Sequence, residues 1–196
     1  MKVLVTAFKP FNNQKNNYSE EVLKYITNVD KLIIDVVYDE SYKDITKCKN
    51  LDDYELIIAL GEARSRSELT LETQAINLSS CSLKDNKGVL KNNEIINSSL
   101  STYLKTKVDI LKCKDYVSLS NDAGKFVCNN LYFHLLEHYP DKCIFIHVPN
   151  CHDDENNYAI FAKKISAGMD DKKARRNFRA GVSCKSILLG VIIYPL

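Results

Sequence analysis

Residues 116–149, with the sequence YVSLSNDAGKFVCNNLYFHLLEHYPDKCIFIHVP, decide the fold that we predict for this chain. A short run of β-forming residues, 116–120, leads into a turn cluster of Asn, Asp, Ala and Gly. From Cys128 onward the apolar residues recur on one helical face, and Pro140 ends the helix. Residues 143–148 are then a continuous apolar run of strand length, which is typical of a strand buried on both faces.

This order of strand, helix and strand predicts a right-handed parallel crossover. In such a unit the first helical turn and the C-terminal end of the next strand lie at one edge of the sheet, where open α/β sheets bind ligands. We therefore expect Cys128 and His147 to meet there. A helix N-terminus and a neighbouring imidazole both lower the pKa of a thiol, and free helical N–H groups can stabilise an oxyanion. Taken singly, each residue is more often an inert core residue, but their predicted meeting favours catalysis.

Two segments resemble a known enzyme family. SNDAGKFVCNNLY, residues 120–132, is similar to the cysteine motif of pyroglutamyl peptidase I, a family of cysteine exopeptidases that remove N-terminal pyroglutamate. FIHVP, residues 145–149, is similar to that family's histidine strand. The resemblance implies that Cys128 is the nucleophile and His147 the base. It also implies a three-layer α/β/α sandwich of the phosphorylase/hydrolase type with a twisted, mostly parallel sheet, and no metal or organic cofactor.

A third segment supplies the remaining triad residue. GEARSRSELTLETQAIN, residues 61–77, resembles the family's Gly-x-Ala-x-x-Arg and Thr-x-Glu-x-x-Ala-x-Asn patterns. The resemblance places Glu72 in the triad, where it would accept a hydrogen bond from His147 and fix the tautomer of the imidazole. The alternation of Leu69 and Leu71 puts Glu72 on the opposite face of its strand. Without the resemblance, Glu72 would be an ordinary solvent-exposed carboxylate.

Candidate substrate-binding residues come from two places. AFKPFNN, residues 7–13, resembles the family's Phe-x-Pro-Phe loop, so Phe8 and Phe11 would enclose the uncharged lactam ring of pyroglutamate. Local packing over the strand end is the alternative for both rings. Glu62 stands where bacterial members tend to carry a glutamine that contacts the lactam. A carboxylate there can accept a hydrogen bond from the lactam N–H but cannot donate one to its carbonyl.

Other positions depart from the family pattern. Asn12 and Asn13 replace glycines, which puts the backbone freedom of their loop in question. Ser82 replaces an arginine before the turn at 83–88, and the resemblance fades after residue 149. These departures favour an alternative function, in which a catalytically impaired family member binds a peptide or a protein.

Composition bounds the remaining function classes. A chain of 196 residues with 45% hydrophobic and 27% charged residues predicts a single globular domain over 1–196, divergent after about residue 150. A net charge of +2 is too small to imply a nucleic-acid or membrane partner. Seven cysteines without a paired spacing indicate free thiols and a cytoplasmic location. Family members tend to self-associate, so a homo-oligomer is a candidate state.

Weaker patterns complete the chain. HLLEH at 134–138 matches the H-x-x-E-H pattern of zinc peptidases, but the apolar stripe turns both histidines toward solvent and no downstream glutamate ligand is evident. The basic cluster at 172–179 is most simply a solvated surface. The pattern further predicts strands at 2–8, 32–38 and 56–60, helices at 105–112 and around 158–165, and a strand or buried helix at 187–193.

Overall fold

A six-stranded sheet forms the centre of the molecule. The computed structural model describes residues 2–110 and 117–166. Within them the strands lie in the order β2-β1-β3-β8-β4-β7, and every neighbouring pair is parallel except β4 with β8. The strands are β1 (Val3–Phe8), β2 (Asp30–Ile34), β3 (Leu56–Glu62), β4 (Thr70–Glu72), β7 (Ser118–Ser120) and β8 (Cys143–Val148). A separate antiparallel pair joins β5 (Gln74–Ile76) and β6 (Tyr103–Lys105).

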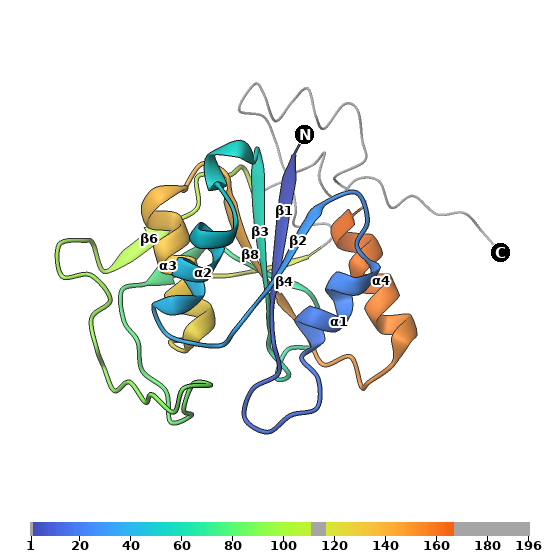
Figure 1. The fold of residues 1–196 in the computed structure, drawn as a ribbon, viewed down its shortest axis with the longest axis horizontal. Helices are drawn as coiled ribbons and strands as arrows, with labels where there is room; N and C mark the ends of the chain where they lie inside the picture. Colours follow the sequence, from blue (N-terminus) through green and yellow to red (C-terminus); the bar gives the residue numbers. More distant parts are fainter. Residues whose placement is uncertain (1, 111–116, 167–196) are drawn as a thin grey trace.

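Helices cover both faces of the sheet, so the molecule has three layers (Figure 1). One face carries α1 (Tyr18–Tyr25) and α4 (Glu155–Ser166), and the other carries α2 (Glu40–Cys48) and α3 (Val127–His138). A 3₁₀ turn, η1 (Leu51–Asp53), precedes β3. The predicted α/β/α sandwich with a mostly parallel sheet is therefore confirmed. No helix in the described ranges is both long enough and apolar enough to span a membrane.

Alternation along the strands decides which face holds the candidate site. In β8, Ile144 and Ile146 pack toward α1 and α4, while Phe145 packs toward α3. The period of two therefore turns His147 to the α3 side as well. In β4, Leu71 packs on the α1 and α4 side, which leaves Glu72 on the face of His147. The alternation that the sequence predicted for Glu72 is confirmed.

The unit around α3 differs from the predicted crossover. β7 is not the parallel neighbour of β8, because β4 lies between them, parallel to β7 and antiparallel to β8. The predicted parallel crossover is therefore wrong. The connecting residues 121–126 nevertheless bring the chain to the edge at which β8 ends, so that α3 begins there. The insertion of β4 depends on pairing between distant segments, which local periodicity does not report.

Several boundaries also differ from the predictions. β2 ends at Ile34, so the predicted strand at 32–38 is too long at its C-terminal end. β6 ends at Lys105 and residues 106–110 form no helix, which contradicts the helix predicted from residue 105; residues 111–116 lie outside the described ranges. The helix expected near 158–165 is confirmed as α4. The segments 172–179 and 187–193 lie outside the described residues, and the single domain over 1–196 stays a prediction.

Candidate active site

A short hydrogen bond joins two of the three predicted triad residues. Nδ1 of His147, near the end of β8, lies 2.7 Å from Oε1 of Glu72, at the end of β4. The side chain of Glu72 is fully buried and that of His147 is 6% exposed. An ionised carboxylate only accepts hydrogen bonds, so with Glu72 ionised this contact places the proton on Nδ1 and leaves Nε2 as the basic nitrogen. His147 is thus held in the tautomer that a general base needs.

The first turn of α3 carries Cys128 and is fixed by two asparagines. Asn129 exchanges hydrogen bonds of 2.9 and 2.8 Å with the backbone of Ile76 in β5. Asn130 donates a bond of 2.8 Å to the carboxylate of Asp39, which precedes α2. Both asparagines are fully buried. Because these bonds tie the helix start to neighbouring elements, the position of Cys128 is set by the fold.

Gly61 allows the sulfur of Cys128 to approach the sheet. Gly61 lies opposite His147 in the register of β3 and β8. A Cβ at this position would lie 2.9 Å from Sγ of Cys128 and 2.7 Å from Cζ of Phe145, which is too close for real Cβ contacts. A glycine is required here because of this close approach, and any larger residue would move the thiol away from the strand of His147.

Cys128 and His147 line one small cavity of about 140 Å³. Its other lining residues are Phe8, Phe11, Asn17, Val36, Glu62, Ala123, Gly124, Lys125 and Phe126. Five of the six predicted site residues therefore share this cavity, and the sixth, Glu72, bonds to His147. An apolar cavity of about 150 Å³ can hold a molecule the size of benzene. The cavity thus suits one small ring.

Phe126 is a lining residue that the sequence patterns did not single out. Its ring centroid lies 5.7 Å from that of Phe11 and 5.5 Å from that of Tyr38, so the three rings form one aromatic cluster. A signal for it exists in the sequence. Phe126 is the N-cap residue of α3, within the cysteine motif. Helices usually begin with a polar N-cap residue, and a phenylalanine side chain cannot accept the capping hydrogen bond. Such an exception indicates a contact outside the helix.

Glu62 faces the cavity but already has two polar partners. One oxygen, Oε2, accepts a hydrogen bond of 2.7 Å from the backbone N–H of Tyr18 at the start of α1. The other, Oε1, accepts one of 2.7 Å from Nε of Arg64. The Glu62 side chain is only 3% exposed. A ligand N–H would therefore share an oxygen that already accepts a hydrogen bond, and the charge of Glu62 is balanced by Arg64.

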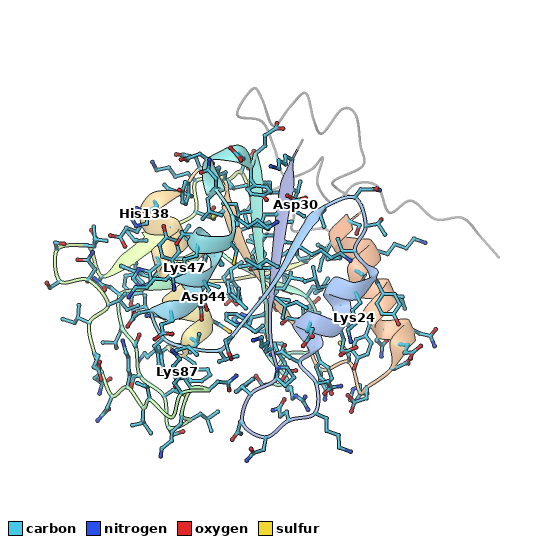
Figure 2. All side chains as sticks on the ribbon, in the orientation of Figure 1. Lys24, Asp30, Asp44, Lys47, Lys87 and His138 are labelled. Carbon is cyan, nitrogen blue, oxygen red and sulfur yellow. The ribbon has the colours of Figure 1, made fainter. Side chains whose placement is uncertain are left out.

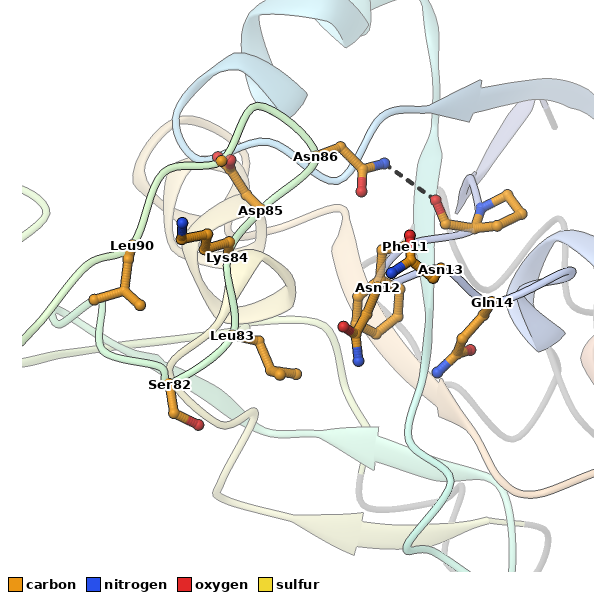
Figure 3. A pocket seen from close by; sticks show the side chains of 12 residues that line it. Phe11, Asn12, Asn13, Gln14, Ser82, Leu83, Lys84, Asp85, Asn86 and Leu90 are labelled. Atoms are coloured by element: carbon orange, nitrogen blue, oxygen red, sulfur yellow. Dashed lines mark hydrogen bonds between the residues drawn. The ribbon is translucent and has the colours of Figure 1, made fainter.

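A wider groove adjoins the small cavity at Phe11 (Figure 3). It has a volume of about 710 Å³ and lies between the loop at 10–14 and the turn at 82–90. Ser82 lines it, and Asn86 donates a hydrogen bond of 3.1 Å to the carbonyl of Pro10, which links the two segments. Phe11 lines both the groove and the small cavity.

Asn12 and Asn13 retain a glycine-like backbone. Their φ angles are 52° and 58°, in the left-handed region. Asparagine tolerates this region better than other residues with a side chain. The two asparagines therefore adopt the positive φ angles that glycines would allow, and they do not prevent this backbone conformation of the loop.

The pKa of the Cys128 thiol is raised, whereas the sequence led us to expect a lowered pKa. Burial raises the pKa of the thiol to about 12, and the negative charges of Glu62 and Glu72 act in the same direction. The backbone N–H of Cys128 favours the thiolate but does not outweigh them. The predicted lowering of the pKa is therefore contradicted. The side chain of Cys128 is therefore a neutral thiol at neutral pH.

Alkylation of Cys128 should report this high pKa. Since only the thiolate reacts, we expect its rate with iodoacetamide to rise about tenfold per pH unit between about pH 7 and 9 without reaching a plateau. The rate is measured on the Cys128 peptide by mass spectrometry, because Cys48 and Cys81 are also accessible. A plateau below about pH 7 would indicate a preformed thiolate–imidazolium pair and contradict the prediction.

The H-x-x-E-H pattern on α3 forms no metal site within the described residues. His138 is exposed, as predicted (Figure 2), whereas His134 is only 18% exposed, with its Nε2 3.3 Å from Oδ1 of Asp39. Both imidazoles stack on Tyr42, with ring centroids 5.5 Å apart. No group of three or more His, Cys, Asp or Glu residues in the described ranges could hold a metal ion. These histidines are structural partners of α2.

Comparisons with known proteins agree with this arrangement. The sequence model described as pyroglutamyl peptidase matches residues 1–159. The pyrrolidone-carboxylate peptidase of Staphylococcus haemolyticus is 34% identical over 171 residues, which cover 76% of this chain and 79% of that protein. The enzyme of the same name from Thermosipho africanus is 33% identical, with 76% and 82% covered.

Solved structures agree as well. Pyroglutamyl peptidase I from Bacillus amyloliquefaciens superposes with a TM-score of 0.71 at 25% identity, covering 82% of this chain and 91% of that one. Pyrrolidone carboxyl peptidase from Pyrococcus furiosus superposes with a TM-score of 0.68 at 28% identity, covering 76% and 81%. With its mostly parallel sheet and its small cavity beside Cys128, this chain belongs to the pyroglutamyl peptidase family of cysteine exopeptidases.

Proposed function

We propose that this protein removes N-terminal pyroglutamate from peptides, with Cys128, His147 and Glu72 as its catalytic triad. One observation carries the proposal: a cavity sized for one ring has the thiol and the imidazole in its wall, and the carboxylate bonded to the imidazole. Membership of the family supports it, since the relatives are pyrrolidone-carboxylate peptidases.

The lining of the cavity favours a lactam over a charged amino terminus. Phe8, Phe11 and Phe126 provide aromatic walls for an uncharged ring. Glu62 is the sole carboxylate among the lining residues, and Arg64 balances its charge. An ammonium group would lose its hydration in this cavity without gaining a free counter-charge, which is unfavourable. We therefore assign Phe8, Phe11 and Glu62, together with Phe126, to substrate binding.

The mechanism is acyl transfer in two steps. Nε2 of His147 takes the thiol proton as Sγ of Cys128 attacks the carbonyl carbon between pyroglutamate and the next residue. The oxyanion is stabilised by N–H groups of the first turn of α3, and Glu72 stabilises the imidazolium. His147 then gives the proton to the leaving amine nitrogen as the C–N bond breaks, which leaves a thioester. Water, deprotonated by His147, hydrolyses the thioester and restores the thiol.

Release of a fluorescent amine from a pyroglutamyl amide tests the proposal. We expect release from the pyroglutamyl compound and at least about a hundredfold less from the matching prolyl amide, because the charged amine of the prolyl compound would lose its hydration in the cavity without gaining a free counter-charge. The alternative, an impaired member that acts as a binding module, predicts no release by wild-type protein whose fold is verified by circular dichroism. Folded protein without activity would overturn the peptidase proposal.

Two further properties belong to this proposal. A nucleophilic thiol needs to stay reduced, which a cytoplasmic location favours, and the five cysteines of the described residues are free thiols. Self-association stays a prediction that the molar mass in solution tests.

A further inference from the structure

Arg66 contacts the triad without lining the cavity. Its Nη2 lies 2.7 Å from Oε1 of Glu72, the same oxygen that Nδ1 of His147 approaches. The same nitrogen also lies 2.8 Å from the carbonyl oxygen of Asp122 and 3.3 Å from Oγ of Ser120. These partners come from β4, from β7 and from the connection to α3, so three elements fix the guanidinium. Its side chain is only 24% exposed.

Glu72 needs a counter-charge to remain ionised. Its side chain is fully buried, and its Oε2 has no hydrogen-bond partner in the part of the chain that the structure describes. Burial disfavours the charged form of a carboxyl group, and a neutral imidazole does not compensate for this. Among the described residues, Arg66 is the permanently charged group within ion-pair distance of Glu72. An arginine keeps its charge at every pH at which the protein is folded.

We propose that Arg66 is a positioning residue, which pairs with Glu72 and thereby keeps the Glu72–His147 pair free of an extra proton at neutral pH. His147 is then available as the base for the thiol of Cys128. Without Arg66, the buried carboxylate favours a proton on itself or on His147, so the pair releases that proton at a higher pH. The consequence for catalysis rests on the proposed peptidase function, but the protonation of the pair does not.

The other titratable groups around the pair do not replace Arg66. Glu62 on β3 is balanced by Arg64, and Cys128 on α3 is a neutral thiol. Tyr132 on α3 donates a hydrogen bond of 2.9 Å to the backbone carbonyl of Glu72, not to its carboxylate. Two more carboxylates belong to nearby segments. Asp122 bonds through its side chain to the N–H of Gly124, and Glu68 accepts a hydrogen bond from Ser118.

The test follows the protonation of the pair by the NMR chemical shifts of the His147 imidazole, which respond when either member takes the proton. The chain has four histidines, so comparison with a His147→Gln spectrum assigns the signal. We expect Arg66→Met to raise the titration midpoint by about one pH unit or more, and Arg66→Lys, which keeps the charge, to restore most of the wild-type value. Lys47→Met, which breaks an exposed ion pair with Asp44 on α2 (Figure 2), should leave the midpoint unchanged.

Activity provides a second readout. For Arg66→Met we expect kcat at neutral pH to fall about tenfold and to recover at alkaline pH, while KM stays within about twofold because Arg66 does not line the cavity. A purely structural role would lower activity at every pH and would not move the midpoint.

An unchanged His147 midpoint in folded Arg66→Met protein would overturn the proposal, whatever its activity. If Arg66→Met does not fold, Arg66→Met combined with Glu72→Gln should fold, because the buried anion is removed together with its counter-charge. A double variant that also fails to fold would overturn the proposal too. The titration needs no substrate. Wild-type protein that does not cleave a pyroglutamyl amide would therefore end the proposed function and leave the Arg66 result to be judged on its own.

Discussion

Replacing Cys128 with alanine is expected to abolish the release of a fluorescent amine from a pyroglutamyl amide, with kcat/KM at least about a thousandfold lower. The reason is that no other nucleophile is available in the cavity wall to form the acyl-enzyme. Among the lining residues, Lys125 is the remaining side chain with a nucleophilic atom outside the triad, and a lysine amine that is not activated is a weak nucleophile.

The fold should tolerate this change. Alanine only shortens the side chain next to Gly61, where space is already limited, and Asn129 and Asn130 still fix the first turn of α3. The Cys128→Ala variant should therefore still bind a pyroglutamyl peptide, which calorimetry can measure. Cys48→Ala, which removes an exposed thiol on α2, is the matched control and should keep full activity. Cleavage by the Cys128→Ala variant at the wild-type rate would exclude the thioester mechanism.

The sequence predicted those parts of the site that depend on local periodicity. The helical spacing after Cys128 and the apolar run that ends near His147 are found as α3 and β8. The alternation of Leu69 and Leu71 also put Glu72 on the correct face, although its carboxylate is buried rather than exposed. Sequence periodicity reports the direction of a side chain, but burial depends on which strand is adjacent, and here that strand is β8.

The remaining features depend on contacts between distant segments. β4 separates β7 from β8, so Cys128 and His147 reach the same edge by a different route from the predicted crossover. The pKa of the Cys128 thiol follows from its burial and from the carboxylates of Glu62 and Glu72, which come from two other strands. Arg66 and Phe126 are equally invisible to periodicity, because one lies in a loop and the other at a helix boundary. A helix N-terminus alone predicts a reactive thiol. Burial of the thiol, with the nearby negative charges as a smaller contribution, here reverses that prediction.

Replacing Glu72 with glutamine is expected to lower kcat by about 10³- to 10⁴-fold, with KM little changed. The amide keeps the shape of the side chain but removes the negative charge that stabilises the imidazolium of His147. In one orientation the amide oxygen of the glutamine faces Nδ1 of His147. The buried NH₂ group then occupies the position of Oε2, where the described residues offer it no hydrogen-bond partner. If the amide is reversed, its NH₂ faces Nδ1 and forces the imidazole proton onto Nε2, the nitrogen that must act as the base. Either orientation weakens the base.

The pH dependence of Glu72→Gln also distinguishes two roles: the negative charge that Glu72 provides, and the counter-charge of Arg66 that keeps Glu72 ionised. Glutamine has no ionisable group, so alkaline pH should not restore its activity, whereas the activity of Arg66→Met should recover there. Glu68→Gln, an exposed neighbour before β4, is the matched control and should stay within about twofold of wild type. Glu72→Gln that retains more than about a tenth of the wild-type kcat would contradict the role of Glu72, since loss of a triad carboxylate costs far more. Recovery of Glu72→Gln at alkaline pH would instead mean that His147 is oriented without this carboxylate, and that its hydrogen bond to Glu72 serves the fold.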